Sequence, residues 1–242
     1  MVISSRPQTH ALGWHSARMD RSMMLDQPKN RMELQSALES EGYALVSGVE
    51  SRDNLLELGR CLGHPVPSPT GETVREIRVT PREKSVAGSQ SSRHGAGSFP
   101  LHTDTVFWAN PVRYVILRGR GDTRRPTLIL TFNELFERCD KRIRDWALRS
   151  VWTVRAGPSS LFCSLQFGSD KWRYDPDLMR PVNESALRVD AELCPISSSG
   201  TGRSIRWSGS TALVLANWRV LHGRGPQPPN EGERIIERLY VR

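Results

Sequence analysis

Apolar residues recur at helical spacing in residues 31–40 and again in residues 54–62, with a short apolar run at residues 42–46 between them. Positions three and four residues apart share one face of a helix, so the two periodic segments are predicted to be amphipathic helices and the short run a strand. Gly63 directly follows the second pattern, which is typical of a helix C-cap. The chain therefore opens with a predicted α/β segment, preceded by an irregular N-terminal arm over residues 1–30.

After residue 70 the pattern changes to short apolar stretches separated by turn residues. Residues 72–80 alternate between polar and apolar side chains, which is the period of a half-buried strand. Further strand-like stretches lie at residues 114–117, 128–132, 161–167, 212–215 and 235–241. Many short strands of this kind favour a jelly roll, so the predicted fold class is mainly β with flanking helices. A helical insertion at about residues 133–151 is predicted to pack on its outside.

Length and composition fit one domain over residues 31–242. The 242 residues are 37% apolar and 25% charged. No apolar stretch approaches the ~18 residues that would suggest a membrane span. The first 30 residues contain no apolar core of a secretory signal, and the four cysteines form no Cys-x-x-Cys pair. We therefore expect a cytoplasmic protein with reduced thiols and no membrane contact.

The formal net charge of +8 raises nucleic-acid binding as one alternative. The basic residues are scattered along the chain, however, and no run of them is longer than two. Scattered arginines are typical of a solvated surface rather than of a phosphate-tracking patch. A nucleic-acid partner is therefore not expected, and the positive field would instead attract small anionic substrates.

The first candidate for chemistry is the motif Leu101-His102-Thr103-Asp104. Residues i and i+2 of an extended strand point to one face, so an imidazole and a carboxylate there could bind one cation. His222, which follows the apolar stretch 212–215, is the candidate third ligand. Two histidines and one carboxylate form the facial triad of non-haem Fe(II) oxygenases, and the same donors would also suit a zinc hydrolase. Short motifs of this kind also arise by chance, as a surface His–Asp pair and a turn histidine.

The second candidate is the C-terminal segment, in which Arg234, Ile236, Arg238 and Tyr240 alternate onto one face. If the opposite face packs against the rest of the domain, both arginines point into the barrel. A buried guanidinium is costly without an anion, and a dicarboxylate cosubstrate would provide one. A solvated basic edge strand is the alternative.

Taken in order, these features resemble the taurine dioxygenase/TfdA-like group of Fe(II)- and 2-oxoglutarate-dependent dioxygenases, which includes the clavaminate synthase-like enzymes. The resemblance covers most of the chain from about residue 31. The opening at residues 41–48 and the helix after it are similar to the opening of the family. His102 and Asp104 match its His-x-Asp motif, and Leu221-His222-Gly223-Arg224 matches its distal histidine.

The family's cosubstrate residues also have counterparts. Arg234 lies twelve residues after His222, where the family places the arginine that binds the far carboxylate of 2-oxoglutarate. Thr127 occupies the position of the family threonine that contacts the same carboxylate. The family often has Gly-Gly before this threonine, whereas this chain has Arg125-Pro126.

The resemblance implies a double-stranded β-helix, a cupin-like jelly roll, in which His102, Asp104 and His222 hold Fe(II). Thr127 and Arg234 would bind the cosubstrate 2-oxoglutarate. It implies an enzyme that consumes O2, releases succinate and CO2, and hydroxylates, desaturates or cyclises a small molecule. The carboxylate of Asp104 favours these outcomes over halogenation, because halogenating relatives lack it.

Substrate contacts are less defined by the sequence. Arg238 matches a position that binds an anionic substrate or the cosubstrate in some members of the family, which implies a carboxylate-bearing substrate such as an amino acid or a biosynthetic intermediate. A structural ion pair is the alternative for Arg238. Phe107 and Trp108 either line the pocket or pack in the core. The Gly/Ser-rich residues 87–99 are predicted to form a loop, and such a loop before the iron motif suits a lid.

Overall fold

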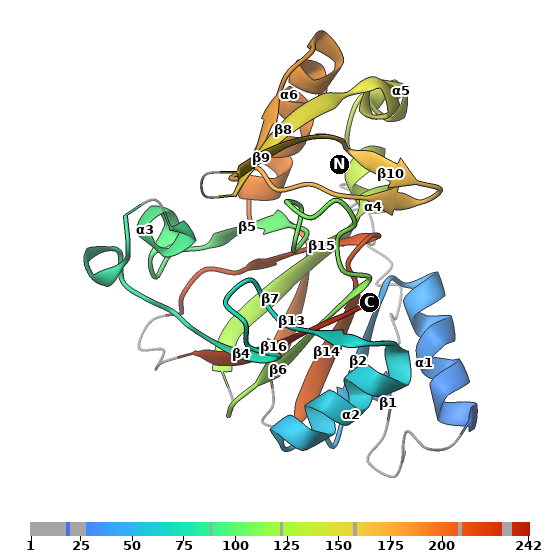
Figure 1. The fold of residues 1–242 in the computed structure, drawn as a ribbon, viewed down its shortest axis with the longest axis vertical. Helices are drawn as coiled ribbons and strands as arrows, with labels where there is room; N and C mark the ends of the chain where they lie inside the picture. The colour runs from blue at the N-terminus through green and yellow to red at the C-terminus, as the bar shows by residue number, and fades with distance from the viewer. Residues whose placement is uncertain are drawn as a thin grey trace, which may run out of the picture.

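Two β-sheets that face each other form the centre of the molecule, and their strands pair antiparallel except for β1 with β2 (Figure 1). The computed structural model describes residues 18–19, 28–87, 89–121, 123–156, 159–207, 210–228 and 234–242. The larger sheet has the order β1-β2-β14-β6-β16-β3, with β4 also paired to β16. The smaller sheet has the order β13-β7-β15-β5. This is the jelly roll that the alternating stretches predicted.

The strands of the two sheets come from distant parts of the chain. Those of the larger sheet are β1 (Arg18–Met19), β2 (Tyr43–Ser47), β3 (Pro65–Val66), β4 (Val74–Arg78), β6 (Tyr114–Gly119), β14 (Thr211–Ala216) and β16 (Ile235–Val241). Those of the smaller sheet are β5 (Phe99–His102), β7 (Thr123–Thr131), β13 (Arg203–Trp207) and β15 (Val220–Arg224). Buried apolar side chains of both sheets, such as Leu117, Ile129 and Ile236, form one core cluster between them.

The N-terminal α/β segment covers the outer face of the larger sheet, as Figure 1 shows for α1 (Pro28–Ser40) and α2 (Arg52–Leu62). Leu34 of α1 and Leu58 of α2 are fully buried in a second cluster with Val214 and Leu239 of the sheet. Helix α2 begins at a capping box made by Ser51 and its third helical residue, and it ends at Gly63 as predicted. The opening of the chain is therefore helix, strand and helix.

A second layer covers the outer face of the smaller sheet and lies above the barrel in Figure 1. Its helices are α4 (Phe132–Glu137), α5 (Ile143–Arg149) and α6 (Glu184–Ser198). Its strands are β8 (Val151–Ala156), β9 (Ser159–Ser164), β10 (Gln166–Gly168), β11 (Lys171–Trp172) and β12 (Met179–Pro181). Trp152 and Leu193 are fully buried here against Leu130 and Leu221 of the smaller sheet.

This layer is larger than the helical insertion predicted at residues 133–151. Two short helices stand in place of one, because α4 ends at Glu137 with Arg138 as its C-cap and the Asp140 carboxylate accepts a hydrogen bond from the backbone of Arg142. Such a local side-chain bond competes with helical pairing. Helix α6 was not predicted, since Pro195 and a serine-rich end obscure its period.

Two further expectations need correction. Residues 87–99 are not only a loop, because they contain the short helix α3 (Gln90–His94), which follows the 3-10 turn η1 (Arg82–Lys84). Most of the predicted arm at residues 1–30 lies outside the described residues, but Arg18–Met19 pairs with β2 and α1 begins at Pro28. All four cysteines are free. In the described part of the chain, no helix is long and apolar enough to cross a membrane.

Candidate functional site

Strand pairing brings the two histidines together. Strand β15 runs antiparallel to β5 in a register that places His222 opposite His102, and their ring centroids are 4.5 Å apart. Asp104 lies two residues beyond β5, with its carboxylate oxygens 3.8 Å from His102 Nε2 and 3.6 Å from His222 Nε2. All three residues are buried. One ligand atom from each lies within 4.8 Å of the others, so the structure brings the predicted triad together.

The turn that carries Asp104 is fixed by Asn217, a residue that sequence reasoning did not single out. The Asn217 side chain accepts a hydrogen bond from Asp104 N at 2.9 Å and donates to the carbonyls of Asp104 and Val112, both at 3.0 Å. Asn217 is fully buried and directly follows the buried strand β14. A carboxamide at the end of a buried strand was the available signal, because such a group must find backbone partners.

Each histidine has a ring nitrogen that faces the Asp104 carboxylate. His102 Nδ1 lies 2.9 Å from the carbonyl of Pro100, which can only accept, so Nδ1 carries a hydrogen and Nε2 is the nitrogen that could bind a metal. Burial, reinforced by the neighbouring His102, lowers the pKa of His222 to about 3. A neutral imidazole is the form that binds a metal.

Asp104 supplies the negative charge of the site. Burial opposes its ionisation, but the guanidinium of Arg238 and the two histidines hold the pKa of Asp104 below its usual value. Arg238 Nη1 donates to both carboxylate oxygens, at 3.0 and 3.3 Å. Although burial works against the charge of Arg238, Asp104 raises its pKa in turn. Carboxylate and guanidinium are therefore both charged at neutral pH.

These donors fit a divalent metal ion. The gaps of 3.6 and 3.8 Å between the carboxylate and the imidazoles exceed hydrogen-bonding distance and leave room for an ion between the groups. His222 Nδ1 is buried and makes no hydrogen bond within the described part of the chain. Two imidazole nitrogens and one carboxylate oxygen on one side of an ion form the facial triad, which suits Fe(II) and leaves coordination positions open.

The second predicted pair also comes together. Arg234, just before β16, donates through Nη2 to Thr127 Oγ1 of β7 at 2.6 Å. Thr127 Oγ1 also lies 3.1 Å from Trp207 Nε1, and the Arg234 guanidinium lies 6.0 Å from the centre of the Trp207 ring. Arg234 is 9% exposed. A buried guanidinium beside a hydroxyl fits a carboxylate, because both groups can donate to it.

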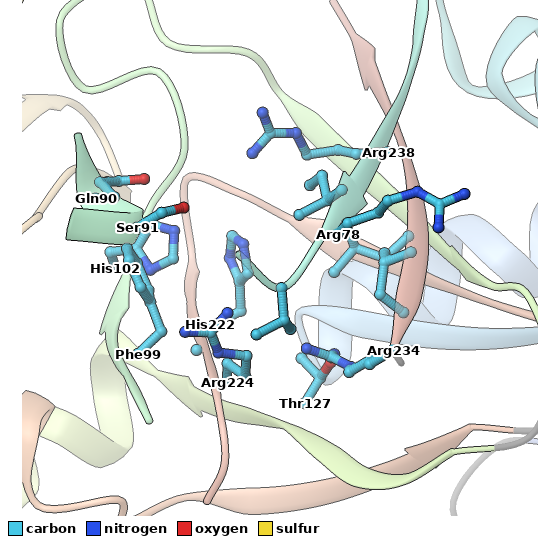
Figure 2. Close-up of a pocket in the computed structure, with 15 residues that line it drawn as sticks. Arg78, Gln90, Ser91, Phe99, His102, Thr127, His222, Arg224, Arg234 and Arg238 are labelled. Atoms are coloured by element: carbon cyan, nitrogen blue, oxygen red, sulfur yellow. The ribbon is translucent and has the colours of Figure 1, made fainter. Parts of the chain in front are cut away.

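One cavity of about 160 Å³ connects the two pairs. Its walls include His102 and His222 at one end and Thr127 and Arg234 at the other (Figure 2). Arg238 projects from β16 on a third side, as the alternation of the C-terminal strand predicted. Apolar parts of the wall are formed by Ile77, Val79, Phe99, Leu117 and Ile236, and polar parts by Arg78, Gln90, Ser91 and Arg224.

The three predicted substrate contacts lie in different surroundings. Arg238 lines the cavity while it is bonded to Asp104. Phe107 packs against the core under the second layer, and Trp108 packs against the core between the sheets. Neither aromatic side chain is among the described residues that line the cavity. Both aromatic side chains thus pack against the core, and their contact with a substrate stays a prediction.

No protein-family model and no curated protein match the chain. Solved structures do match it. An asparagine oxygenase in complex with Fe(II), 3-hydroxyasparagine and succinate superposes with a TM-score of 0.71 and 17% identity, over 89% of this chain and 79% of that one. The non-haem iron oxygenase OrfP with Fe and α-ketoglutaric acid gives a TM-score of 0.66 and 19% identity, over 88% and 80% of the two chains. PvcB from Pseudomonas aeruginosa gives 0.64 and 15%, over 90% and 81%.

These likenesses extend over most of each chain, so they show the fold. The expected jelly roll and its resemblance to iron oxygenases are confirmed at that level. At such low identity the activity of this chain has to be argued from its own side chains.

Proposed function

We propose that this protein is a non-haem iron oxygenase that uses Fe(II), 2-oxoglutarate and O2 to oxidise a small carboxylate-bearing substrate. The single observation that carries the proposal is the shared cavity. His102 and His222 of the metal-binding cluster line it together with the buried Arg234–Thr127 pair. A zinc hydrolase would use the two histidines and Asp104, but its reaction would give the Arg234–Thr127 pair no ligand to bind. A dicarboxylate cosubstrate gives both groups a partner.

Each group has a distinct part in this reaction. His102, Asp104 and His222 would hold the iron from one side and leave its other positions accessible from the cavity. Arg234 and Thr127 would bind the far carboxylate of 2-oxoglutarate and so fix its orientation. When bound, iron and 2-oxoglutarate supply activation of O2 coupled to decarboxylation of the cosubstrate to succinate and CO2.

The apolar walls support the same reaction. Leu117 and Ile236 belong to the core between the sheets and face the cavity, where they exclude water. A site with few water molecules strengthens the electrostatic contacts of Arg234 and prevents loss of reactive species to solvent. Arg238 would bind the carboxylate of an acidic substrate while its guanidinium also donates a hydrogen bond to Asp104.

A carboxylate-bearing small molecule is the proposed substrate class. The structurally similar asparagine oxygenase and OrfP were solved with 3-hydroxyasparagine and 3-hydroxyarginine, which are hydroxylated amino acids. Amino acids and related biosynthetic acids are therefore the first compounds to screen. Hydroxylation, desaturation and ring formation are the outcomes to look for.

The test begins with binding. Protein reconstituted anaerobically with Fe(II) should bind 2-oxoglutarate and develop a weak visible charge-transfer band. His102→Ala should lose the band together with the iron. In air, the wild-type protein should release succinate from 2-oxoglutarate, and the release should rise when an accepted acid is added. Native protein that contains zinc and binds no 2-oxoglutarate would contradict the proposal and favour the hydrolase.

A further inference from the structure

Helix α3 forms one wall of the cavity. Gln90 and Ser91 of this helix line it, and Figure 2 shows both on the opposite side of the view from Arg234 and Thr127. A carboxamide and a hydroxyl can each donate and accept hydrogen bonds. Neither residue belongs to the proposed metal or cosubstrate groups, so the two are free to contact the substrate.

Arg125 holds the segment that follows α3. It is 1% exposed, and its Nη2 donates to the carbonyls of Ala96 at 2.5 Å and Gly97 at 2.6 Å. Its Nε donates to the carbonyl of Gly225 at 3.0 Å, just beyond β15. One guanidinium thus ties residues 89–97, which we call the cap segment, to the barrel.

Arg224 makes a second clamp on the same segment. Its Nη2 donates to the carbonyl of Gly95 at 2.7 Å and its Nε to that of Gly97 at 3.0 Å. Burial, together with the charge of Arg125, lowers the pKa of Arg224 to about 10, so it stays charged at neutral pH. Two neighbouring guanidinium groups repel each other, and the carbonyls of residues 95–97 compensate both.

The two clamps are built into the strands that carry the candidate site. Arg125 lies two residues before Thr127 on β7, and Arg224 lies two residues after His222 on β15. The ladder between these strands pairs Arg224 with Thr127. The position of the cap segment is therefore set by the strands that position Thr127 and His222.

The other side of the cap segment is also fixed. His94 Nε2 lies 2.5 Å from Asp177 Oδ2, and Arg93 donates to the carbonyl of Asp177 at 2.9 Å. The His94 ring packs on Phe99, and the Phe99 ring packs on His102, with centroid distances of 4.6 and 4.7 Å. Contacts on both sides give α3 one defined place beside the candidate metal site.

We infer that Gln90 and Ser91 determine substrate specificity and that Arg125 and Arg224 are positioning residues that hold them against the substrate. The inference rests on the proposed function. It specifies the substrate further: the acid bound by Arg238 carries, at its other end, a polar group that hydrogen-bonds to a carboxamide and a hydroxyl. Arg125 is not among the described residues that line the cavity, whereas Arg224 lines it, so the cosubstrate control is measured on Arg125→Lys.

The first experiment measures amide hydrogen exchange in the full-length protein loaded with Fe(II) and 2-oxoglutarate under anaerobic conditions. Arg125→Lys keeps the charge, but a single ammonium cannot reach the three carbonyls in the geometry of a guanidinium. Exchange in residues 89–97 should rise by about tenfold or more, because hydrogen bonds from a charged donor are lost. The affinity for 2-oxoglutarate should stay within about twofold of the wild type.

Arg173→Lys is the matched control, because Arg173 binds the carbonyls of Val106, Trp108 and Ala109 in the same manner. It should leave exchange in residues 89–97 unchanged. Arg224→Gln should also raise exchange in residues 89–97, which keeps the test valid if one variant fails to fold. Unchanged exchange in both arginine variants, or an equal loss of 2-oxoglutarate affinity, would overturn the positioning role.

The second experiment uses a panel of amino acids and related carboxylic acids as substrates. For an accepted acid, Gln90→Ala and Ser91→Ala should raise KM by about tenfold, the effect of one lost hydrogen bond to a buried group, with little change in the KM for 2-oxoglutarate. Arg125→Lys should raise the same KM and increase succinate release that is not coupled to product. If both alanine variants prefer the same acids of the panel as the wild type, by the same factors, the specificity role is refuted. A wild-type protein that binds no 2-oxoglutarate would refute the proposed function instead, and the exchange measurement on the protein alone would still decide the clamp.

Discussion

Replacing Arg234 with alanine tests the cosubstrate half of the site most directly. The guanidinium is 9% exposed and donates to Thr127 at 2.6 Å, so the protein already holds it in one orientation before any ligand binds. The far carboxylate of 2-oxoglutarate would complete a buried charge pair. Arg234→Ala removes one partner of that pair and leaves the carboxylate to face a largely apolar wall.

The size of the effect follows from this arrangement. Truncating one member of a buried, hydrogen-bonded charge pair costs about 2–5 kcal/mol. The hydroxyl of Thr127 remains in Arg234→Ala and can still donate to the carboxylate, which places the expected loss at about 2–4 kcal/mol. At about 1.4 kcal/mol for each factor of ten, the dissociation constant for 2-oxoglutarate should rise roughly 30- to 700-fold. Thr127→Ala should cost less, about 1.5–3 kcal/mol, and the double variant less than the sum, because the two side chains are bonded to each other.

Anaerobic calorimetry on Fe(II)-loaded protein would measure these constants. Arg188→Ala is a suitable control, since it removes an exposed guanidinium on α6 that pairs with Glu184. Its 2-oxoglutarate affinity should equal that of the wild type. An Arg234→Ala protein that is folded, retains iron and binds 2-oxoglutarate within twofold of the wild type would refute the assignment of Arg234 to the cosubstrate.

Three further changes test the site and the fold. Asp104→Asn should lower iron affinity on the order of 100-fold or more, measured by metal titration, and retention of one iron per chain would contradict the triad. Glu237→Gln should lower the free energy of unfolding by about 3–5 kcal/mol at pH 7, because it leaves the buried Arg118 without its carboxylate. Although burial opposes ionisation, hydrogen bonds from Arg52 and Arg118 hold the pKa of Glu237 below its usual value. The stabilisation by ionised Glu237 is therefore complete above the unfolded pKa of about 4.3 and is lost as the pH falls through the lower folded pKa. The free energies of unfolding of the wild type and Glu237→Gln, measured by denaturation, should converge in acid. A difference that stays constant with pH would contradict this account. Gly42→Ala should destabilise the fold by about 1–3 kcal/mol, since Gly42 has φ of +79° and an added methyl group would overlap Val220, whereas an unchanged melting temperature would contradict it.

Local periodicity in the sequence was sufficient for much of the fold. The spacing of Leu34 and Leu38 predicted α1, and the alternation around Ile77 predicted β4, because each pattern states which face of an element is buried. The alternation of Arg234, Ile236 and Arg238 predicted that the two arginines share one face with an apolar residue, and all three line the cavity. The short helix α3 and the long helix α6 were not predicted, because polar residues and Pro195 obscure their periods.

Residue type and order in the sequence by themselves determined which groups are available for chemistry: a His-x-Asp motif, a distal histidine, and a threonine with an arginine. Only the tertiary structure decided which of them meet. The register of β15 against β5 sets His222 opposite His102, the contact of Asn217 fixes Asp104, and Arg125 turns from an unexplained departure into a clamp on the cap segment. The physical reason is that a local pattern shows which face of a strand is buried but does not encode which distant strand it pairs with or in what register. The side-chain contacts of the site depend on that pairing.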